Sequence, residues 1–595
     1  VIQAAADVLG VKNPQGTSLQ PETAAAQRRL LIEALSRTLV RPGALTILHV
    51  EDVHWIDPSS QELLDGLVAA NQDSPLLILM TARPEYEPPM AWRGRVTTIN
   101  VERLLDADVK QLVSSLARDE ASAEDLAARS DGIPLFAEAL AESYDLNDAN
   151  VPATLQELLY QQLDRLGEAR ATAQVAAVFG REFLLSRLQD ILGIDPRQLE
   201  NHMNALLDAG LIFPGSRGDQ SHYVFKHALV HELAYDSLLK KARREYHLKI
   251  AELLANRYSE STQPHELARH FSQAREHERA ATLWLEAGRK AFKRSGHREA
   301  VGFLRQGLNE IRGISDETTR AETEITLQTY LGESLSALEG YASEDTQNAF
   351  ERARELSIAI NRTESTFRAV SRLQAVALVQ SHLDHTYALS RELQALAASM
   401  DNPKAQADAD TMMGITAYRA GKFDEAQKHF RDAIAYHLEE HETGNFGSVA
   451  AHADAFMCNT LWLLGQPESA IEHGEAALRR AQATAHAFNE AAVLNCLGAT
   501  RIHRGEFDLT LEVSSDLAIL AQEHDFLLHS LNARCLRGIA LIGKGQLVEG
   551  IRELEGGIEA FVSSGQGTYA TYYRSYLAEA YILASQLEQA KDEIA

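Results

Sequence analysis

The chain of 595 residues lacks three features that would each assign it to a class of protein. Its three cysteines, Cys458, Cys496 and Cys535, are odd in number and far apart, which excludes a disulfide framework and favours a reducing cytoplasm. The longest apolar runs, such as Leu76 to Met80, are far below the ~18 residues of a membrane span. Basic residues are also scarce, with 57 Lys and Arg against 84 Asp and Glu, so a chain of net charge −27 does not wrap nucleic acid. We expect a soluble cytoplasmic protein.

The N-terminal part of the chain alternates between strand and helix patterns. Leu45 to Val50 is a short apolar run that ends in the acids Glu51 and Asp52, as expected of a buried strand. Asp57 followed by Pro58 predicts the start of a helix, and Leu76 to Met80 and Val96 to Val101 predict two further strands. Alternating strands and helices indicate a parallel, doubly wound sheet, whose ligands bind at the carboxyl ends of the strands.

Residues 106 to 258 have mainly helical periodicity, which is interrupted once by a turn and once by two short strands. Residues 106 to 144 predict a small helical subdomain, broken at Gly132-Ile133-Pro134. Between residues 152 and 258, three helices precede a helix capped by Asp195-Pro196 and stopped at Gly210, and two short strands follow. This order predicts a winged helix. Its recognition-position helix has only Arg197 as a firm cation, so we expect a docking module and no direct contact with nucleic acid.

Beyond about residue 264 the chain is helical and repeats itself. A turn position recurs at Gly421, Gly465, Gly505, Gly545 and Ser585, in steps of 44, 40, 40 and 40 residues. Around the first turn, small and aromatic residues such as Gly414 and Phe430 fall at the spacing of a tetratricopeptide hairpin. Such hairpins bury their apolar faces only by stacking, so they predict a solenoid with a concave binding surface for a protein or peptide.

One segment carries the strongest chemical signal and a family resemblance. Residues 50 to 60 read Val-Glu-Asp-Val-His-Trp-Ile-Asp-Pro-Ser-Ser. They resemble the Walker B strand of the STAND class of signalling NTPases, in particular bacterial proteins that join this ATPase to tetratricopeptide repeats. The resemblance implies binding of ATP or ADP with Mg²⁺. It assigns Glu51 to the magnesium side and Asp52 to the acid that positions or deprotonates the attacking water. Many relatives have Asp at the position of Glu51, so which acid faces the metal stays open, while Asp57 is expected to act only as a helix cap.

The same resemblance extends to four residues outside that strand. Arg83, at the end of the second strand, resembles a sensor arginine that contacts the terminal phosphate, although a surface arginine before a proline turn would look the same. Gly132 and Pro134 resemble the Gly-x-Pro element near the adenine. His227 matches a histidine that touches the diphosphate in related apoptotic and plant-resistance NTPases. The aspartate that follows it there is missing, so a core or capping histidine is the alternative.

A phosphate-binding loop of the form Gly-x4-Gly-Lys-Ser/Thr is absent. The only Gly-Lys pairs, at Gly421 and Gly543, belong to repeat turns. Because the chain starts at Val1 without methionine, we expect a part of a longer protein that holds half of the nucleotide site and is inactive alone. Zinc at His227 and His231 has no third ligand in view and is set aside.

The fold expected is therefore mainly α, with four parts. Residues 1–104 form the end of a P-loop NTPase core, 105–150 a helical lid, 151–260 a winged helix and 261–595 the repeat solenoid. Residues 339–343 and 349–353 resemble sequence segments of bacterial class III adenylate or guanylate cyclase proteins that carry such a region. We expect a regulatory ATPase region of such a protein, which oligomerises on activation. The alternatives are a LuxR-type transcriptional regulator and a scaffold that does not hydrolyse ATP.

Overall fold

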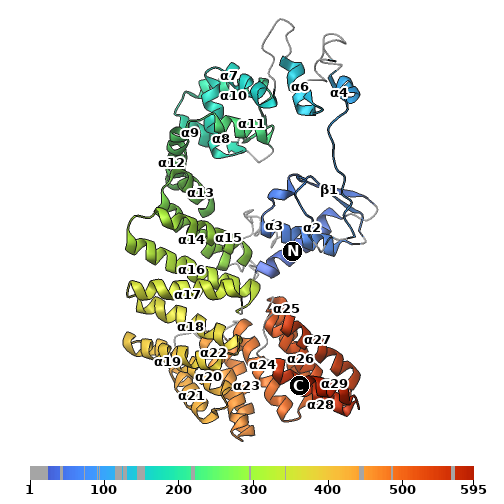
Figure 1. Ribbon diagram of the computed structural model, residues 1–595, viewed down its shortest axis with the longest axis vertical. Helices are drawn as coiled ribbons and strands as arrows, with labels where there is room; N and C mark the ends of the chain where they lie inside the picture. Colours follow the sequence, from blue (N-terminus) through green and yellow to red (C-terminus); the bar gives the residue numbers. More distant parts are fainter. Residues whose placement is uncertain are drawn as a thin grey trace. The chain divides into compact units, whose positions relative to one another are not determined.

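A computed structural model describes most of the chain (Figure 1), and the contacts within it divide the chain into two compact units. The described residues are 24–40, 44–72, 74–89, 92, 94–113, 124, 130–143, 154–215, 222–293, 296–341, 343–440, 448–483, 487–524, 526–563 and 570–594. One unit contains Val1–Thr81 together with Leu285–Ala595, and the other contains Ala82–Trp284. Helices make up most of both units. Within the described ranges, no helix has the length and apolar character needed to cross a bilayer.

A pair of parallel strands forms the centre of the N-terminal segment. Its elements are α2 (Ala24–Leu39), β1 (Thr46–Val50), the single-turn helix η1 (Val53–Trp55), α3 (Pro58–Ala70) and β2 (Leu76–Met80). Thr46 pairs with Leu76 and Val50 with Met80, so both strands end at the same edge. A parallel pair needs a crossover connection, and α3 supplies it.

Two expectations for this segment were wrong. Val96 to Val101 is not a strand but an exposed connection in which Val101 is 94% exposed, because no strand of the described residues pairs with it. β1 and β2 are also not fully buried, since Ile47 and Leu79 on one face are 59% and 52% exposed. A continuous apolar run predicts cover on both faces of a sheet, but only one face is covered by the described residues.

The second unit begins with two short helices and continues into a larger helical body. It contains α4 (Asp106–Val113), α6 (Pro134–Ser143), α7 (Leu155–Arg165), α8 (Ala169–Phe179), α9 (Leu185–Leu192), α10 (Pro196–Asp208), α11 (Ala228–Asp236), α12 (Lys240–Arg257) and α13 (Pro264–Ala274). Val109, Phe136 and Leu158 bring α4, α6 and α7 into one small core. A second core, with Phe183 and Phe225 among its members, joins α7 to α13.

A three-stranded antiparallel sheet lies within that second core. β3 (Glu182–Leu184) pairs with β5 (His222–Phe225), which in turn pairs with β4 (Ile212–Pro214). The predicted helix start is confirmed, because the Asp195 carboxylate accepts a hydrogen bond from the Arg197 amide at 2.9 Å and Pro196 begins α10. The sequence pattern did not reveal β3, whose three residues are too few for an alternating pattern to emerge.

The rest of the chain is an array of antiparallel helices. These are α14 (His277–Lys293), which runs across the division between the units, α15 (His297–Glu310), η3 (Ile311–Gly313), α16 (Glu317–Glu339), α17 (Glu344–Ala359), α18 (Thr363–Val379), α19 (Leu383–Met400), α20 (Pro403–Arg419), α21 (Phe423–Glu440), α22 (Ser448–Leu463), α23 (Pro467–Ala483), α24 (Ala487–His503), α25 (Phe507–Glu523), α26 (Leu527–Gly543), α27 (Leu547–Ser563), α28 (Ala570–Leu583) and α29 (Leu587–Ile594). Sequential neighbours pack on one another, as in a helical-repeat solenoid.

The predicted repeat turns are confirmed by their backbone geometry. Gly421, Gly465, Gly505, Gly545 and Ser585 all have φ between 61° and 81° and each follows the first helix of a hairpin. Ser381, 40 residues before Gly421, has φ of 61° and extends the series by one hairpin. Glycine adopts this conformation without strain, which explains why four of the six positions are glycine.

Close contact between paired helices is confirmed at the predicted small residues. A Cβ atom at Gly414 would lie 2.6 Å from the Phe430 ring, so only glycine lets α20 and α21 approach this closely. Gly332 and Phe350 repeat the arrangement between α16 and α17, again with 2.6 Å. At equivalent places in the two hairpins, the apolar core thus pairs a glycine on one helix with a phenylalanine on the other.

Candidate functional site

The predicted acids lie where the two parallel strands end. The Thr81 amide donates to the Val50 carbonyl at 3.0 Å, and the Val53 amide donates back to the Thr81 carbonyl at 2.9 Å. Between them, Asp52 has φ of 53° and ψ of 42°, and its amide donates to the Thr81 hydroxyl at 2.9 Å. A left-handed aspartate is uncommon and is held here by the second strand. The chain therefore leaves β1 in a fixed turn that carries two adjacent carboxylates.

These carboxylates suit a hard cation that also binds other oxygen ligands. The Glu51 side chain is 66% exposed, with His49 Nδ1 at 4.0 Å from Oε1, and Asp52 is partly exposed. Mg²⁺ takes one or two protein carboxylates and completes its octahedron with phosphate oxygens and water. Glu51 and Asp52 can supply that share, so the residues present fit the magnesium nucleotide implied by the resemblance.

Asp57 has the structural role expected of it. Its Oδ1 accepts a hydrogen bond from the Ser60 amide at 3.0 Å, and its Oδ2 accepts one from the Ser60 hydroxyl at 2.6 Å. These bonds cap the first turn of α3, whose first residue is Pro58. Asp57 is therefore a helix cap, as predicted.

The remaining predicted site residues fall in the second unit. Glu51 and Asp52 belong to the unit with Val1–Thr81, whereas Arg83, Gly132, Pro134 and His227 belong to Ala82–Trp284. Arg83 is exposed, two residues beyond Thr81, and its carbonyl accepts a hydrogen bond from the Tyr86 amide at 3.0 Å. Its role as a sensor thus stays a prediction.

The Gly-x-Pro element forms a tight turn before α6. Gly132 has φ of 70°, and a Cβ atom there would lie 2.4 Å from the Leu104 carbonyl oxygen. The Leu104 amide donates to the Gly132 carbonyl at 2.9 Å, and the exposed Pro134 begins α6. The glycine is required by the backbone itself, so this element has a structural reason to exist whether or not adenine binds beside it.

His227 stands at the N-terminus of α11, as the sequence predicted. It is the N-cap residue, it is half-buried, and its carbonyl accepts hydrogen bonds from the amides of Val230 and His231. The helix N-terminus is a place where a phosphate group would be stabilised. His231, one turn later, is anchored instead, because its Nε2 donates a hydrogen bond to the Ala177 carbonyl oxygen at 2.9 Å. Burial lowers the pKa of His231, so the ring is neutral.

The repeats present an aromatic cluster that the sequence analysis missed. The cluster consists of Trp462, His503, Tyr572 and Tyr576, from α22, α24 and α28. The Trp462 and His503 rings stack at 5.8 Å, and the hydroxyls of Tyr576 and Tyr572 lie 3.2 Å and 3.4 Å from the two ring nitrogens of His503. Burial lowers the pKa of His503 and raises that of Tyr576. The cluster is therefore uncharged near neutral pH.

This contact also defines the inner face of the array. α24, α26 and α28 are first helices of successive hairpins, so residues on α24 and α28 meet only if the array curves toward that face. The signal that could have found the cluster is positional, since Trp462 and His503 lie three and two residues before the turn glycines Gly465 and Gly505. The cluster lies on the face where a concave solenoid holds its partners.

Comparisons with known proteins complete the description. No protein-family model matches the chain. An uncharacterized protein of Rhizobium meliloti (strain 1021) is 25% identical over 596 residues, covering 94% of this chain and 57% of that protein. The chain thus spans 57% of the length of this curated relative.

Two solved structures are also similar, each at 13% sequence identity. A Signal Transduction ATPase with Numerous Domains protein with a tetratricopeptide repeat sensor, from Pyrococcus horikoshii, has a TM-score of 0.42, covering 95% of this chain and 82% of that chain. A Rap protein complexed with Competence and Sporulation Factor has a TM-score of 0.33, covering 73% and 99% of the two chains.

Proposed function

We propose that this chain is the ATP-binding regulatory region of a multidomain bacterial signalling protein of the STAND type. The observation that carries the proposal is the turn after β1. There the Glu51-Asp52 pair follows a parallel strand, and Asp52 is tied to the neighbouring strand through the Thr81 hydroxyl. Adjacent carboxylates at a strand end repel each other, and a cation with its phosphate ligands would offset that repulsion.

The two acids have different tasks in this proposal. Magnesium supplies charge neutralisation on the phosphates of the bound nucleotide. Glu51 would help to hold it, while the Asp52 carboxylate would orient a water molecule and accept its proton as that water attacks the terminal phosphorus and the bond to the bridging oxygen breaks, which releases ADP and phosphate. The bond from the Asp52 amide to Thr81 fixes the backbone from which this carboxylate extends. Arg83 donates charge-assisted hydrogen bonds to the terminal phosphate.

The second unit responds to the nucleotide. In this proposal Gly132 and Pro134 would contact the adenine, and His227 at the start of α11 would contact the diphosphate. We infer that the helices α7 to α11 with the sheet β3-β5-β4 act as a winged helix that serves as a docking module. ATP then favours one arrangement of the two units and ADP another, which makes the region a switch. Oligomerisation would follow from the active arrangement.

The repeats receive a protein or peptide partner. The aromatic cluster offers broad, uncharged surface on the inner face of the array, and aromatic side chains contribute large contact areas at interfaces. A partner that binds there would shift the balance between the nucleotide states by its different affinity for each. The repeat region is thus the sensor of the switch.

In this proposal the domain that carries out the response lies outside this chain, and there are two candidates for it. A class III adenylate or guanylate cyclase domain is favoured by the likeness of residues 339–343 and 349–353 to such proteins. A LuxR-type transcriptional regulator shares the same middle region and is the second candidate. The sequence of the complete protein separates the two, because one would contain a cyclase domain and the other a helix-turn-helix domain.

Calorimetry tests the nucleotide part of the proposal. ATP and ADP, each with Mg²⁺, are titrated into the full-length protein and into the chain of 595 residues. We expect saturable binding to the full-length protein and none, or much weaker binding, to the chain, which lacks a phosphate-binding loop. Absence of binding to a folded full-length protein would favour a scaffold in which only the repeats act.

A further inference from the structure

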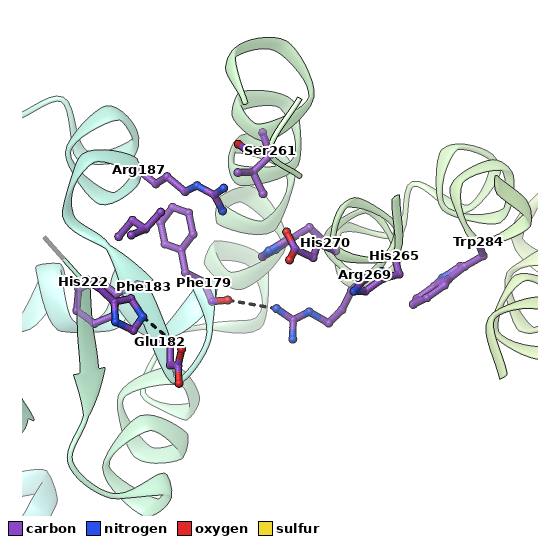
Figure 2. Close-up of a pocket in the computed structure, with 13 residues that line it drawn as sticks. Phe179, Glu182, Phe183, Arg187, His222, Ser261, His265, Arg269, His270 and Trp284 are labelled. Atoms are coloured by element: carbon purple, nitrogen blue, oxygen red, sulfur yellow. Dashed lines mark hydrogen bonds and ion pairs between the residues drawn. The ribbon is translucent and has the colours of Figure 1, made fainter. Parts of the chain in front are cut away.

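A cavity of about 910 Å³ lies inside the unit Ala82–Trp284 (Figure 2), and its lining includes none of the residues placed in the nucleotide site. Its walls come from the end of α8, β3, α9 and β5 on one side and from α12, α13 and Trp284 on the other. Pockets for small molecules have volumes of roughly 300–1,000 Å³, so the cavity has room for one.

Two arginines contribute to the cavity from different helices. Figure 2 shows Arg187 on α9 and Arg269 on α13, with the Arg269 guanidinium donating to the Phe179 carbonyl at 3.2 Å. Arg187 lies over the Tyr258 ring at 5.3 Å, and its buried Nε has no hydrogen-bond partner among the described residues. Neither arginine forms an ion pair with a carboxylate in the described ranges. A buried donor without an acceptor is costly, which favours an acceptor supplied from outside.

Neither acid that lines the cavity, Glu182 or Glu266, forms an ion pair with Arg187 or Arg269 among the described residues. Glu182 lies with Oε2 at 3.2 Å from Nε2 of the buried His222, and Glu266 lies in the first turn of α13. His270 is buried in the wall, and its Nδ1 lies 2.9 Å from Nδ1 of His247. Burial, then His247, Arg269 and Arg187 lower the pKa of His270 to about 3. Both guanidinium groups therefore disfavour protonation of the His270 ring.

Part of the remaining lining is apolar, beside the polar Ser261 and His265. Phe179, Phe183, Leu254 and Trp284 face the same space, and the Trp284 indole is held by a hydrogen bond from Nε1 to the Ser272 hydroxyl at 3.0 Å. A flat or aliphatic body would pack against these side chains while its charged end meets the arginines. Such a combination selects amphipathic anions over inorganic ones.

We propose that this cavity binds a small organic anion, with a carboxylate or phosphate between Arg187 and Arg269 and an apolar body against Phe179, Phe183 and Trp284. None of the predicted nucleotide contacts lines the cavity, so the proposal stands whether or not ATP binds beside Asp52. Because α9 and β3 meet α13 across the cavity, a bound anion would stabilise the contact between the sheet-bearing helices and α13.

Calorimetry with defined probes tests the site in the chain of 595 residues. Phenyl phosphate and phenylacetate represent the two charged groups, and inorganic phosphate and benzyl alcohol lack one half of the recognition each. We expect saturable binding of one or both aromatic anions and much weaker binding of the two partial probes. Equal affinity for phenyl phosphate and inorganic phosphate would contradict a role for the apolar wall.

Variants locate the binding. Arg269→Gln changes an exposed arginine, and Arg187→Gln removes the other cation. Each should weaken binding of the aromatic anion by about ten-fold or more. Arg197→Gln on α10 is the matched control, because it removes an exposed arginine of the same unit outside the cavity. Arg269→Gln still gives a result if Arg187→Gln fails to fold. No saturable binding to the wild type, or binding unaffected by Arg269→Gln, would overturn the proposal.

Discussion

The amide of Asp52 donates a hydrogen bond to the hydroxyl of Thr81 over 2.9 Å, across 29 residues of sequence. This bond joins the ends of two parallel strands and holds Asp52 in a left-handed conformation. The bond fixes the backbone from which the Asp52 carboxylate extends. The relationship shows how two paired strands present the two acids of the proposed nucleotide site together.

Thr81→Val tests this positioning role in the full-length protein. Valine has the shape of threonine but cannot accept the hydrogen bond, so the Asp52 turn loosens while both carboxylates remain. We expect ATP turnover to fall by roughly ten-fold with a smaller effect on ATP binding, since misplacement of a positioned group affects mainly the chemical step. Steady-state hydrolysis and calorimetry measure the two effects. Thr98→Val, at an exposed position, is the control and should change neither.

The geometry of the repeat turns predicts different effects of two small substitutions on the free energy of unfolding. Gly421→Ala places a Cβ atom on a residue with φ of 74° and should lower the unfolding free energy by about 1 kcal/mol. Ser381→Gly removes a Cβ atom at φ of 61° in the equivalent turn and should not lower it, despite the greater freedom of glycine in the unfolded chain. Urea denaturation compares the pair. A larger loss for Ser381→Gly than for Gly421→Ala would contradict the equivalence of these turns.

The repeats were the most predictable part of the fold, because a turn with positive φ selects glycine at a fixed spacing. The strand ends were also predictable, since Glu51, Asp52 and Asp57 each follow a local rule of strand or cap. The exposed run from Val96 to Val101 shows the limit of prediction from sequence. Its β-branched residues are typical of a strand, but no strand of the described residues pairs with it. Arg187 and Arg269 are 82 residues apart in the sequence and line one cavity only in the folded chain, so no sequence pattern predicted the cavity.

Asp454 predicts a stability effect inside the repeats. Its carboxylate, 2% exposed, accepts two hydrogen bonds from Arg480, at 2.7 Å and 3.1 Å, and links α22 to α23. Asp454→Ala leaves the guanidinium without its partner and should cost about 3 kcal/mol in denaturant unfolding. Asp508→Ala breaks an exposed ion pair with Lys544 and should cost less than about 1 kcal/mol. Similar costs for the two variants would contradict the account.

Two buried histidines predict acid sensitivity of the second unit. Burial, with Arg269 next, lowers the pKa of His247 from 6.5 to about 4, and burial lowers that of its neighbour His270 to about 3. The unfolded chain therefore takes up protons below about pH 6.5 that the folded unit does not accept until much lower pH. Unfolding free energy should fall between pH 6.5 and pH 4, by up to about 1.4 kcal/mol per pH unit for each ring.

Denaturation curves between pH 7.5 and pH 4.5 measure this loss. The double variant His247→Gln with His270→Gln should show a flatter dependence on pH than the wild type. His385→Gln, at an exposed position in the repeats, should leave the dependence unchanged. An identical slope for the double variant and the wild type would assign the acid sensitivity to other groups.

The central claim is that Asp52 serves the chemistry of ATP hydrolysis while Asp57, five residues later, only caps a helix. Asp52→Asn and Asp57→Asn make the same chemical change in the full-length protein, and asparagine still caps a helix. Single-turnover hydrolysis of ATP with Mg²⁺ is the most direct measurement. We expect Asp52→Asn to bind ATP with turnover reduced by about 10²-fold or more, and Asp57→Asn to hydrolyse it at the wild-type rate. Unchanged hydrolysis in Asp52→Asn would contradict the account.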